Sequence, residues 1–278
     1  MHVEKWRGPP VERVWTRWRN VGGVVAGERE RAVEVLRRAS RVVALTGAGM
    51  SQESGVPTFR DALTGLWSRY DPMELATPDA FRRNPARVFG WYLSRWRGAR
   101  TVSPHAGHVA LARLEGAFGD FAVVTQNVDG LHRRAGSREI VELHGCLEAF
   151  RCFDGGHSFD IDRIEQLAPP EDAEVEPPAC DTCGSPIRPG VVWFGETLPA
   201  GAVERAWRLV QQSDVVLVIG TSAVVYPAAE LPGVALAAGA EVIEINPQET
   251  PLTPRATLTW RATAAAALPQ LADALGVR

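Results

Sequence analysis

Long apolar runs are missing from this chain of 278 residues, and the longest ones, at residues 215–220 and 234–240, are far too short to span a bilayer. The N-terminal residues mix charge with tryptophan and contain no apolar signal-peptide segment. We therefore expect a cytoplasmic protein that is not inserted in a membrane.

An excess of charge of one sign is also missing. The net charge is −3 and the pI is about 6.1, so no basic field attracts nucleic acid or a membrane surface. Lysine is nearly absent, since Lys5 is the only lysine among 30 basic residues, and arginine keeps its charge whatever its surroundings. The hydrophobic and charged fractions, 45% and 23%, are ordinary and exclude disordered and collagen-like classes.

Cysteine is scarce, with four residues in the chain. Two of them form the pair Cys180-x-x-Cys183, which is more typical of a metal site in a reducing compartment than of disulfides.

Short apolar runs alternate with helical patterns along most of the chain. The runs at residues 41–46, 121–127, 214–222 and 241–246 are bounded by polar or small residues and read as strands of a sheet covered on both faces. Helical periodicity precedes the first run and recurs at residues 105–114, 202–212 and 230–238. Strands that alternate with helices predict an α/β fold with a Rossmann-like parallel sheet and helices on both faces.

Two segments interrupt this alternation. Residues 61–100 are helical and rich in aromatic side chains, with Thr77-Pro78 as a helix start, and residues 146–190 hold the cysteines and an acidic, proline-rich stretch. We interpret both as a smaller inserted module beside a core of residues 28–60, 101–145 and 191–278. Residues 1–27, which include three tryptophans, read as an N-terminal extension to a catalytic domain of residues 28–278.

Small and hydrogen-bonding residues follow all four predicted strands, at residues 46–49, 125–129, 220–222 and 246. Ligands of open α/β sheets bind beyond the carboxyl ends of the strands, and glycines after a first strand let backbone N–H groups approach a phosphate. The spacing is not G-x-G-x-x-G, and the acidic residue expected about 20 positions later is missing, which disfavours an ordinary hydride-transferring dehydrogenase.

Five ordered motifs resemble the sirtuin family of NAD-dependent protein deacylases. They are GAGMSQESGVPTFR from Gly47, TQNVDGLH from Thr125, ELHG from Glu142, VVWFGE from Val191 and GTSAVVYPA from Gly220. The resemblance extends over roughly residues 30 to 275 and implies a protein that binds NAD and acts on acylated lysine side chains of other proteins.

The resemblance also implies an NAD site. Glycine-loop backbone and a hydroxyl would hold the pyrophosphate, polar groups after the second strand would bind ribose and carboxamide, and an aromatic ring would cover the nicotinamide ribose. The matching residues are Gly47, Ala48, Gly49, Ser51, Phe59, Arg60, Gln126, Asn127, Val128, Asp129, Gly220, Thr221, Ser222, Asn246, Pro247, Gln248 and Ala264, the last in an alanine-rich stretch that could be a plain loop.

His144 in the ELHG motif would be the general base, because an imidazole can accept a ribose hydroxyl proton near neutral pH. The implied products are nicotinamide, lysine and O-acyl-ADP-ribose. An ADP-ribosyltransferase that uses the same pocket is the alternative activity, and a non-enzymatic NAD-sensing module is a further alternative that the presence of Asn127, Asp129 and His144 disfavours.

Tyr92 and Arg95 lie three residues apart on one predicted helical face, and Ala76 precedes them. In the sirtuin setting they resemble the class III subgroup, in which tyrosine and arginine hold the carboxylate of succinyl or malonyl groups. Val192, Trp193 and Phe194 would line the acyl-lysine channel, and Gly195 and Glu196 would pair with the substrate backbone.

Most sirtuins carry two C-x-x-C pairs that bind structural zinc. Here Cys152 begins the first pair, but Gly155 stands where its partner is expected. Cys152, Cys180 and Cys183 are candidate ligands, with His157 or Cys146 as the fourth. A zinc site and a metal-free module both remain open at this point.

Overall fold

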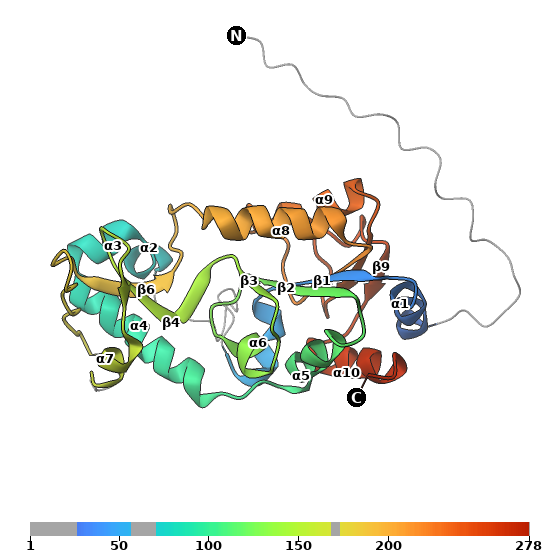
Figure 1. Ribbon diagram of the computed structural model, residues 1–278, viewed down its shortest axis with the longest axis horizontal. Coiled ribbons are helices and arrows are strands. Elements are labelled where there is room, and N and C mark those ends of the chain that lie inside the picture. Colours follow the sequence, from blue (N-terminus) through green and yellow to red (C-terminus); the bar gives the residue numbers. More distant parts are fainter. Residues whose placement is uncertain (1–26, 57–70, 168–172, 278) are drawn as a thin grey trace, which may run out of the picture.

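The computed structural model describes residues 27–56, 71–167 and 173–277, and it has an α/β architecture (Figure 1). Its larger part is a six-stranded parallel sheet in the order β3-β2-β1-β7-β8-β9. The strands are β1 (Arg41–Thr46), β2 (Asp120–Thr125), β3 (Ile140–Glu142), β7 (Val215–Ile219), β8 (Glu241–Ile245) and β9 (Leu258–Trp260). The four expected strands are therefore confirmed, as is the fold class.

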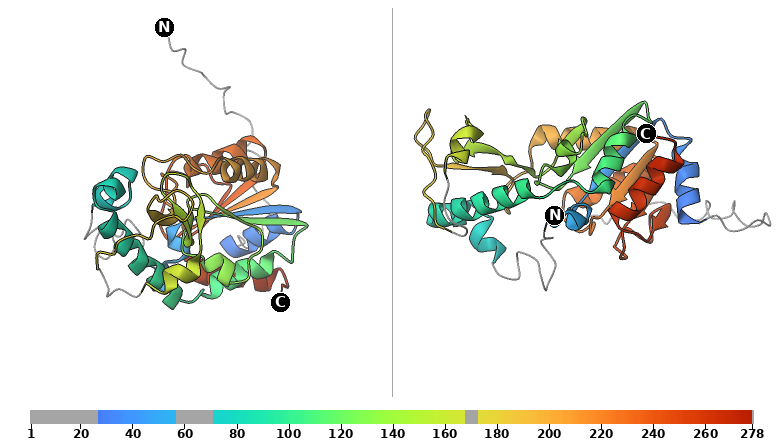
Figure 2. Two further views of the ribbon diagram at one scale, coloured as in Figure 1. Left: turned by 60° about the vertical axis from the view of Figure 1, so that its left-hand side comes forward. Right: turned by 90° about the horizontal axis from the view of Figure 1, so that it is seen from below.

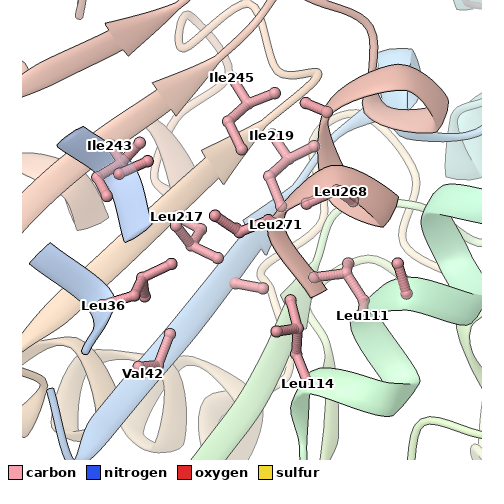
Figure 3. Packing of buried hydrophobic residues seen from close by; sticks show 14 of the residues in the cluster. Leu36, Val42, Leu111, Leu114, Leu217, Ile219, Ile243, Ile245, Leu268 and Leu271 are labelled. Carbon is pink, nitrogen blue, oxygen red and sulfur yellow. The ribbon is translucent and has the colours of Figure 1, made fainter. Parts of the chain in front are cut away.

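Side chains of successive strand residues point to opposite faces of the sheet, and each face is covered by helices. Val42 and Ala44 of β1 pack against α1 (Glu28–Leu36), α5 (Ala106–Leu114) and α10 (Ala264–Ala274), as Figure 3 shows for part of this cluster. Val43 and Leu45 pack against α8 (Ala200–Gln212) and α9 (Leu231–Ala237) on the other face. Two hydrophobic cores thus fix the sheet between two helical layers.

Several elements were not predicted from the sequence. β3 and β9 are edge strands of three residues each, which is too short to show a periodic pattern. The stretch at Ala264, which the sequence allowed to be a loop, is the first turn of α10. Alanine is the best helix former, and Ala267 and Leu271 are fully buried against the sheet.

A smaller unit lies at one end of the parallel sheet (Figure 2). It combines the antiparallel sheet β5-β4-β6 with four helices around an aromatic core that includes Phe81, Phe89 and Trp96. Its elements are α2 (Pro72–Leu75), α3 (Pro78–Arg83), α4 (Pro85–Thr101), β4 (Gly145–Cys152), β5 (Ser158–Phe159), α7 (Ile161–Glu165) and β6 (Ile187–Val191). The expected helix start is confirmed, because the Thr77 hydroxyl accepts the Ala80 N–H at 3.1 Å.

The remaining described helices are short. They are α6 (Leu131–Arg134) and the 3₁₀ turns η1 (Ala48–Met50), η2 (Gln52–Ser54) and η4 (Ala228–Glu230). Within the described residues, every helix is too short or too polar to traverse a bilayer. Residues 1–26 of the expected extension lie outside the described part of the chain, and the domain boundaries stay a prediction.

Two glycine loops cross directly after β1 and β7. The N–H of Gly47 donates to the carbonyl of Ile219 at 3.1 Å, and the N–H of Gly49 donates to the carbonyl of Gly220 at 2.8 Å. A Cβ atom on Gly49 would lie 2.8 Å from that carbonyl oxygen and 2.9 Å from the Gly220 Cα. The contact between the two loops therefore already requires glycine at this crossing, whether or not a ligand also approaches the backbone there.

We predict that Gly49→Ala destabilises the protein by about 1–3 kcal/mol, because the new methyl group overpacks backbone atoms that cannot move aside. Gly98→Ala is the matched control. A Cβ on Gly98, in the exposed part of α4, meets nothing within 4 Å, so this change should stabilise the helix by roughly 0.5–1 kcal/mol. Denaturant unfolding checks both values, and a Gly49→Ala protein as stable as the wild type would contradict the crossing geometry.

Candidate active site

One pocket of about 1030 Å³ lies where the carboxyl ends of the parallel strands face the smaller unit. The strand-end loops after β1, β2, β7 and β8 form one side of it, and residues of α4 and of the segment after β6 form the other. The volume is at the upper end of the range of about 300–1,000 Å³ found for small-molecule sites, as an extended ligand such as a dinucleotide requires.

Most of the residues expected to bind the cofactor line this pocket. Ser51 and Asp129 do not, and both are buried; Ser51 is in contact with Asn127, whose side-chain amide donates to its hydroxyl. Phe59 and Arg60 lie outside the described residues. The lining members are Gly47, Ala48, Gly49, Gln126, Asn127, Val128, Gly220, Thr221, Ser222, Asn246, Pro247, Gln248 and Ala264.

Amide side chains connect the strand-end loops. Asn127 Nδ2 donates to the Gly47 carbonyl at 3.0 Å and to Ser51 Oγ at 3.1 Å. Gln126 Nε2 donates to Thr221 Oγ1 at 3.1 Å. The polar groups that the sequence assigned to a ligand thus also hold the loops in fixed positions relative to each other.

His144 lies half-buried in the pocket wall, directly after β3. Its Nδ1 is 3.0 Å from the carbonyl oxygen of Gln126, and because a carbonyl only accepts, Nδ1 must carry the proton in this contact. The neutral ring then keeps the lone pair on Nε2. Burial lowers the pKa of His144 below the ordinary 6.5, although the Gln126 carbonyl acts in the opposite direction. The imidazole is therefore neutral and basic at pH 7.

Ala76, Tyr92 and Arg95 line the end of the pocket formed by the smaller unit. Burial raises the pKa of Tyr92 to about 12, so its hydroxyl remains a hydrogen-bond donor at neutral pH. Burial also lowers the pKa of Arg95, yet a guanidinium stays charged near neutrality. The guanidinium carbon of Arg95 lies 4.8 Å from the centre of the Trp91 ring.

The segment after β6 forms the adjoining wall with Val192, Trp193, Phe194 and Gly195. The Val192 N–H donates to the His144 carbonyl at 2.8 Å, and the Phe194 N–H donates to the Ala76 carbonyl at 2.9 Å. This segment therefore connects the candidate base to the acyl end of the pocket.

Glu196 supports this segment from within. Its carboxylate accepts the Trp193 N–H at 2.8 Å and forms an ion pair with the buried Arg188, whose guanidinium stacks on the Trp193 ring at 3.3 Å. The Glu196 N–H donates to the Trp193 carbonyl at 3.1 Å. Pairing of Gly195 and Glu196 with a peptide backbone stays a prediction.

Sequence reasoning missed several lining residues. Glu53 accepts hydrogen bonds from Thr263 Oγ1 at 3.0 Å and from the Ala265 N–H at 2.9 Å, at the first turn of α10. Val225 and Tyr226 also line the pocket, and Tyr226 is 70% exposed. Glu53 and Tyr226 both stand inside motifs that drew the resemblance, so motif membership was the available signal.

Cys152, His157, Cys180 and Cys183 gather in the smaller unit, with their ligand atoms within 4.8 Å of one another. The sulfur atoms of Cys152 and Cys183 are 3.7 Å apart, against about 3.8 Å for two thiolates on tetrahedral zinc. The donor set therefore fits zinc.

Cys146, the less favoured candidate ligand, does not belong to this cluster. It is buried in β4, and burial raises the pKa of its thiol to about 12. None of the four clustered residues lines the pocket, so a metal held there would be separate from the candidate base.

Comparison with known proteins connects these features to one family. Residues 47–227 match the Sir2 family model. NAD-dependent protein deacylase 1 of Pseudomonas aeruginosa is 50% identical over 78% of this chain and 86% of its own length, and an NAD-dependent protein deacylase of Aquifex aeolicus is 48% identical over 84% and 95%. A solved complex of a Sir2 homologue with NAD is 44% identical with a TM-score of 0.81, over 93% of this chain and 96% of that one. The chain thus belongs to the Sir2 family, the sirtuins.

Proposed function

We propose that this protein is an NAD-dependent protein-lysine deacylase that removes succinyl and malonyl groups, as well as acetyl groups, and forms nicotinamide and O-acyl-ADP-ribose. The observation that carries the acyl preference is the position of Tyr92 and Arg95 in the wall of the pocket that also contains His144. The cytoplasmic location expected from the sequence stays a prediction.

The strand-end loops would hold NAD. NAD supplies a ribose carbon that becomes electrophilic as nicotinamide leaves. Asn127 and Gln126, fixed by their bonds to the glycine loops, would orient the nicotinamide half. Ser222 would contact the pyrophosphate, and Asn246 would contact the adenosine ribose. Loops that are already in place before binding reduce the entropy lost on binding.

His144 would act as general base on a ribose hydroxyl. Its Nδ1 bond to the Gln126 carbonyl fixes the tautomer with Nε2 unprotonated, and the lowered pKa keeps that form populated at neutral pH. An imidazole whose pKa lies below 7 is neutral at pH 7, so it can accept a proton without first losing one.

The acyl group would lie between Ala76 and the aromatic wall of the segment after β6. A carboxylate at its far end would meet the Arg95 guanidinium and the Tyr92 hydroxyl, which is protonated because its pKa is about 12. Charge-assisted hydrogen bonds to a guanidinium are roughly twice as strong as neutral ones, and they gain strength in a site with little water. A shorter neutral acetyl group would still fit the same channel.

We predict that His144→Ala abolishes acyl removal while NAD binding, measured by calorimetry, is retained. In the wild type, kcat/KM should fall on acidification only below pH 6.5, since catalysis needs the neutral ring and the pKa of His144 lies below that value. An acidic limb above pH 6.5, or a His144→Ala enzyme with full activity, would disprove the role. Labelling of protein by ADP-ribose without any acyl peptide would instead support the transferase alternative.

We predict that Arg95→Met lowers kcat/KM for a succinyl-lysine peptide by at least ~30-fold and changes acetyl-lysine turnover little, because about 2–5 kcal/mol is lost when one partner of a buried charge pair is removed. Arg100→Met is the matched control, since Arg100 lies on the same helix but is exposed and paired with Glu165. Matched acetyl, malonyl and succinyl peptides make the measurement. An equal loss on all three peptides would refute the proposed selectivity while leaving the deacylase activity intact.

A further inference from the structure

We propose that this chain binds zinc through a Cys₃His set, in which Nδ1 of His157 takes the place of the fourth thiolate and Gly155 provides the space for the imidazole. The inference concerns the ligand set of the cluster in the smaller unit and does not depend on the acyl preference. It starts from the glycine at the position where the family resemblance expects a cysteine.

The distances match a mixed tetrahedral site. His157 Nδ1 lies 3.3 Å from Cys152 Sγ and 3.6 Å from Cys180 Sγ. Zinc bonds of about 2.3 Å to sulfur and about 2.0–2.1 Å to nitrogen give about 3.5–3.6 Å between such ligands in a regular tetrahedron. His157 is thus already at ligand distance from two of the three sulfur atoms, through the nitrogen nearer its backbone.

Gly155 and the His157 ring exclude a larger residue at position 155. A Cβ atom on Gly155 would lie 2.6 Å from Cε1 and 2.9 Å from Nδ1 of His157. A side chain at position 155 would therefore displace the imidazole from the cluster. The fourth ligand can come from a cysteine at position 155 or from a histidine at position 157, and this chain has the histidine.

The backbone between Cys152 and His157 supports the same assignment. The Cys152 N–H donates to the His157 carbonyl at 2.8 Å, and the His157 N–H donates to Cys152 Sγ at 3.2 Å. Gly156 has a φ angle of +67°, which lets the chain reverse before β5. The reversal places His157 next to the sulfur of Cys152.

The change of ligand also alters the charge of the site. Three thiolates and a neutral imidazole around Zn²⁺ carry a net charge of −1, whereas four thiolates carry −2. Asp154 and Asp181 lie between cluster residues in sequence. Asp154 accepts a hydrogen bond from the Ser185 hydroxyl, and Asp181 is paired with Arg163. The mixed ligand set leaves less negative charge at the cluster than four thiolates would.

The first test is the visible spectrum of the full-length protein loaded with Co²⁺ in place of zinc. We expect the bands of a tetrahedral three-sulfur, one-nitrogen site, which differ from those of a four-sulfur site. His157→Ala should weaken zinc binding, measured by competition with a chromogenic chelator, by at least ~10-fold. Glu165→Ala, in the same unit but outside the cluster, is the matched control and should bind zinc as the wild type does.

The double variant Gly155→Cys/His157→Ala keeps the proposal testable if the single variant folds poorly. It should recover zinc binding and show the Co²⁺ spectrum of four thiolates. A wild-type spectrum without a nitrogen ligand, or a His157→Ala protein with unchanged zinc affinity and spectrum, would overturn the assignment. All of these readouts are independent of deacylase activity, so a failure of the proposed function would not be mistaken for a failure of this site.

Discussion

The parallel register of β1 with its two neighbours is the constraint on which the site depends. Thr46 at the end of β1 lies opposite Thr125 of β2 and Ile219 of β7, so three strands end at the same level. The loops that follow must cross there, and backbone can approach backbone closely only where side chains are absent. Because the three strands end together, their loops need glycines where they cross and are held in place by the side-chain amides of Gln126 and Asn127. The ligand site is therefore formed before any ligand binds.

The pocket exists because two separately packed units meet at this edge. The sheet and its two helical layers bury aliphatic side chains, whereas the smaller unit is built on aromatic rings. His144 and the segment after β6 join them through the bond between Val192 and His144. The cluster of three cysteines and a histidine lies in the smaller unit away from the pocket. A metal held there would therefore stabilise the smaller unit and would not contact the reacting groups.

The sequence predicted those elements whose residues follow a strong local pattern, either a continuous apolar run or a helical periodicity. Four buried strands, the paired helices and the polar strand ends were predictable because parallel strands covered on both faces are continuous apolar runs. Short edge strands were not, since β9 has only three residues. The motifs located most of the pocket. The burial of Ser51 and Asp129, and the use of the Gly49 N–H by the opposite loop, depend on tertiary contacts that no local pattern encodes.

The smaller unit already contains one example of the interaction proposed for the acyl group. Arg188, buried and stacked on Trp193, is held by the Glu196 carboxylate at the edge of the same pocket. Two charges taken from water are stable there only because hydrogen bonds satisfy both, as the Trp193 N–H and the Val191 carbonyl do. A succinyl carboxylate at Arg95 would repeat this arrangement, with the Tyr92 hydroxyl as the additional donor. Selectivity would then come from the charge-assisted hydrogen bonds that a succinyl carboxylate adds at Arg95 and Tyr92, which a neutral acetyl group cannot form.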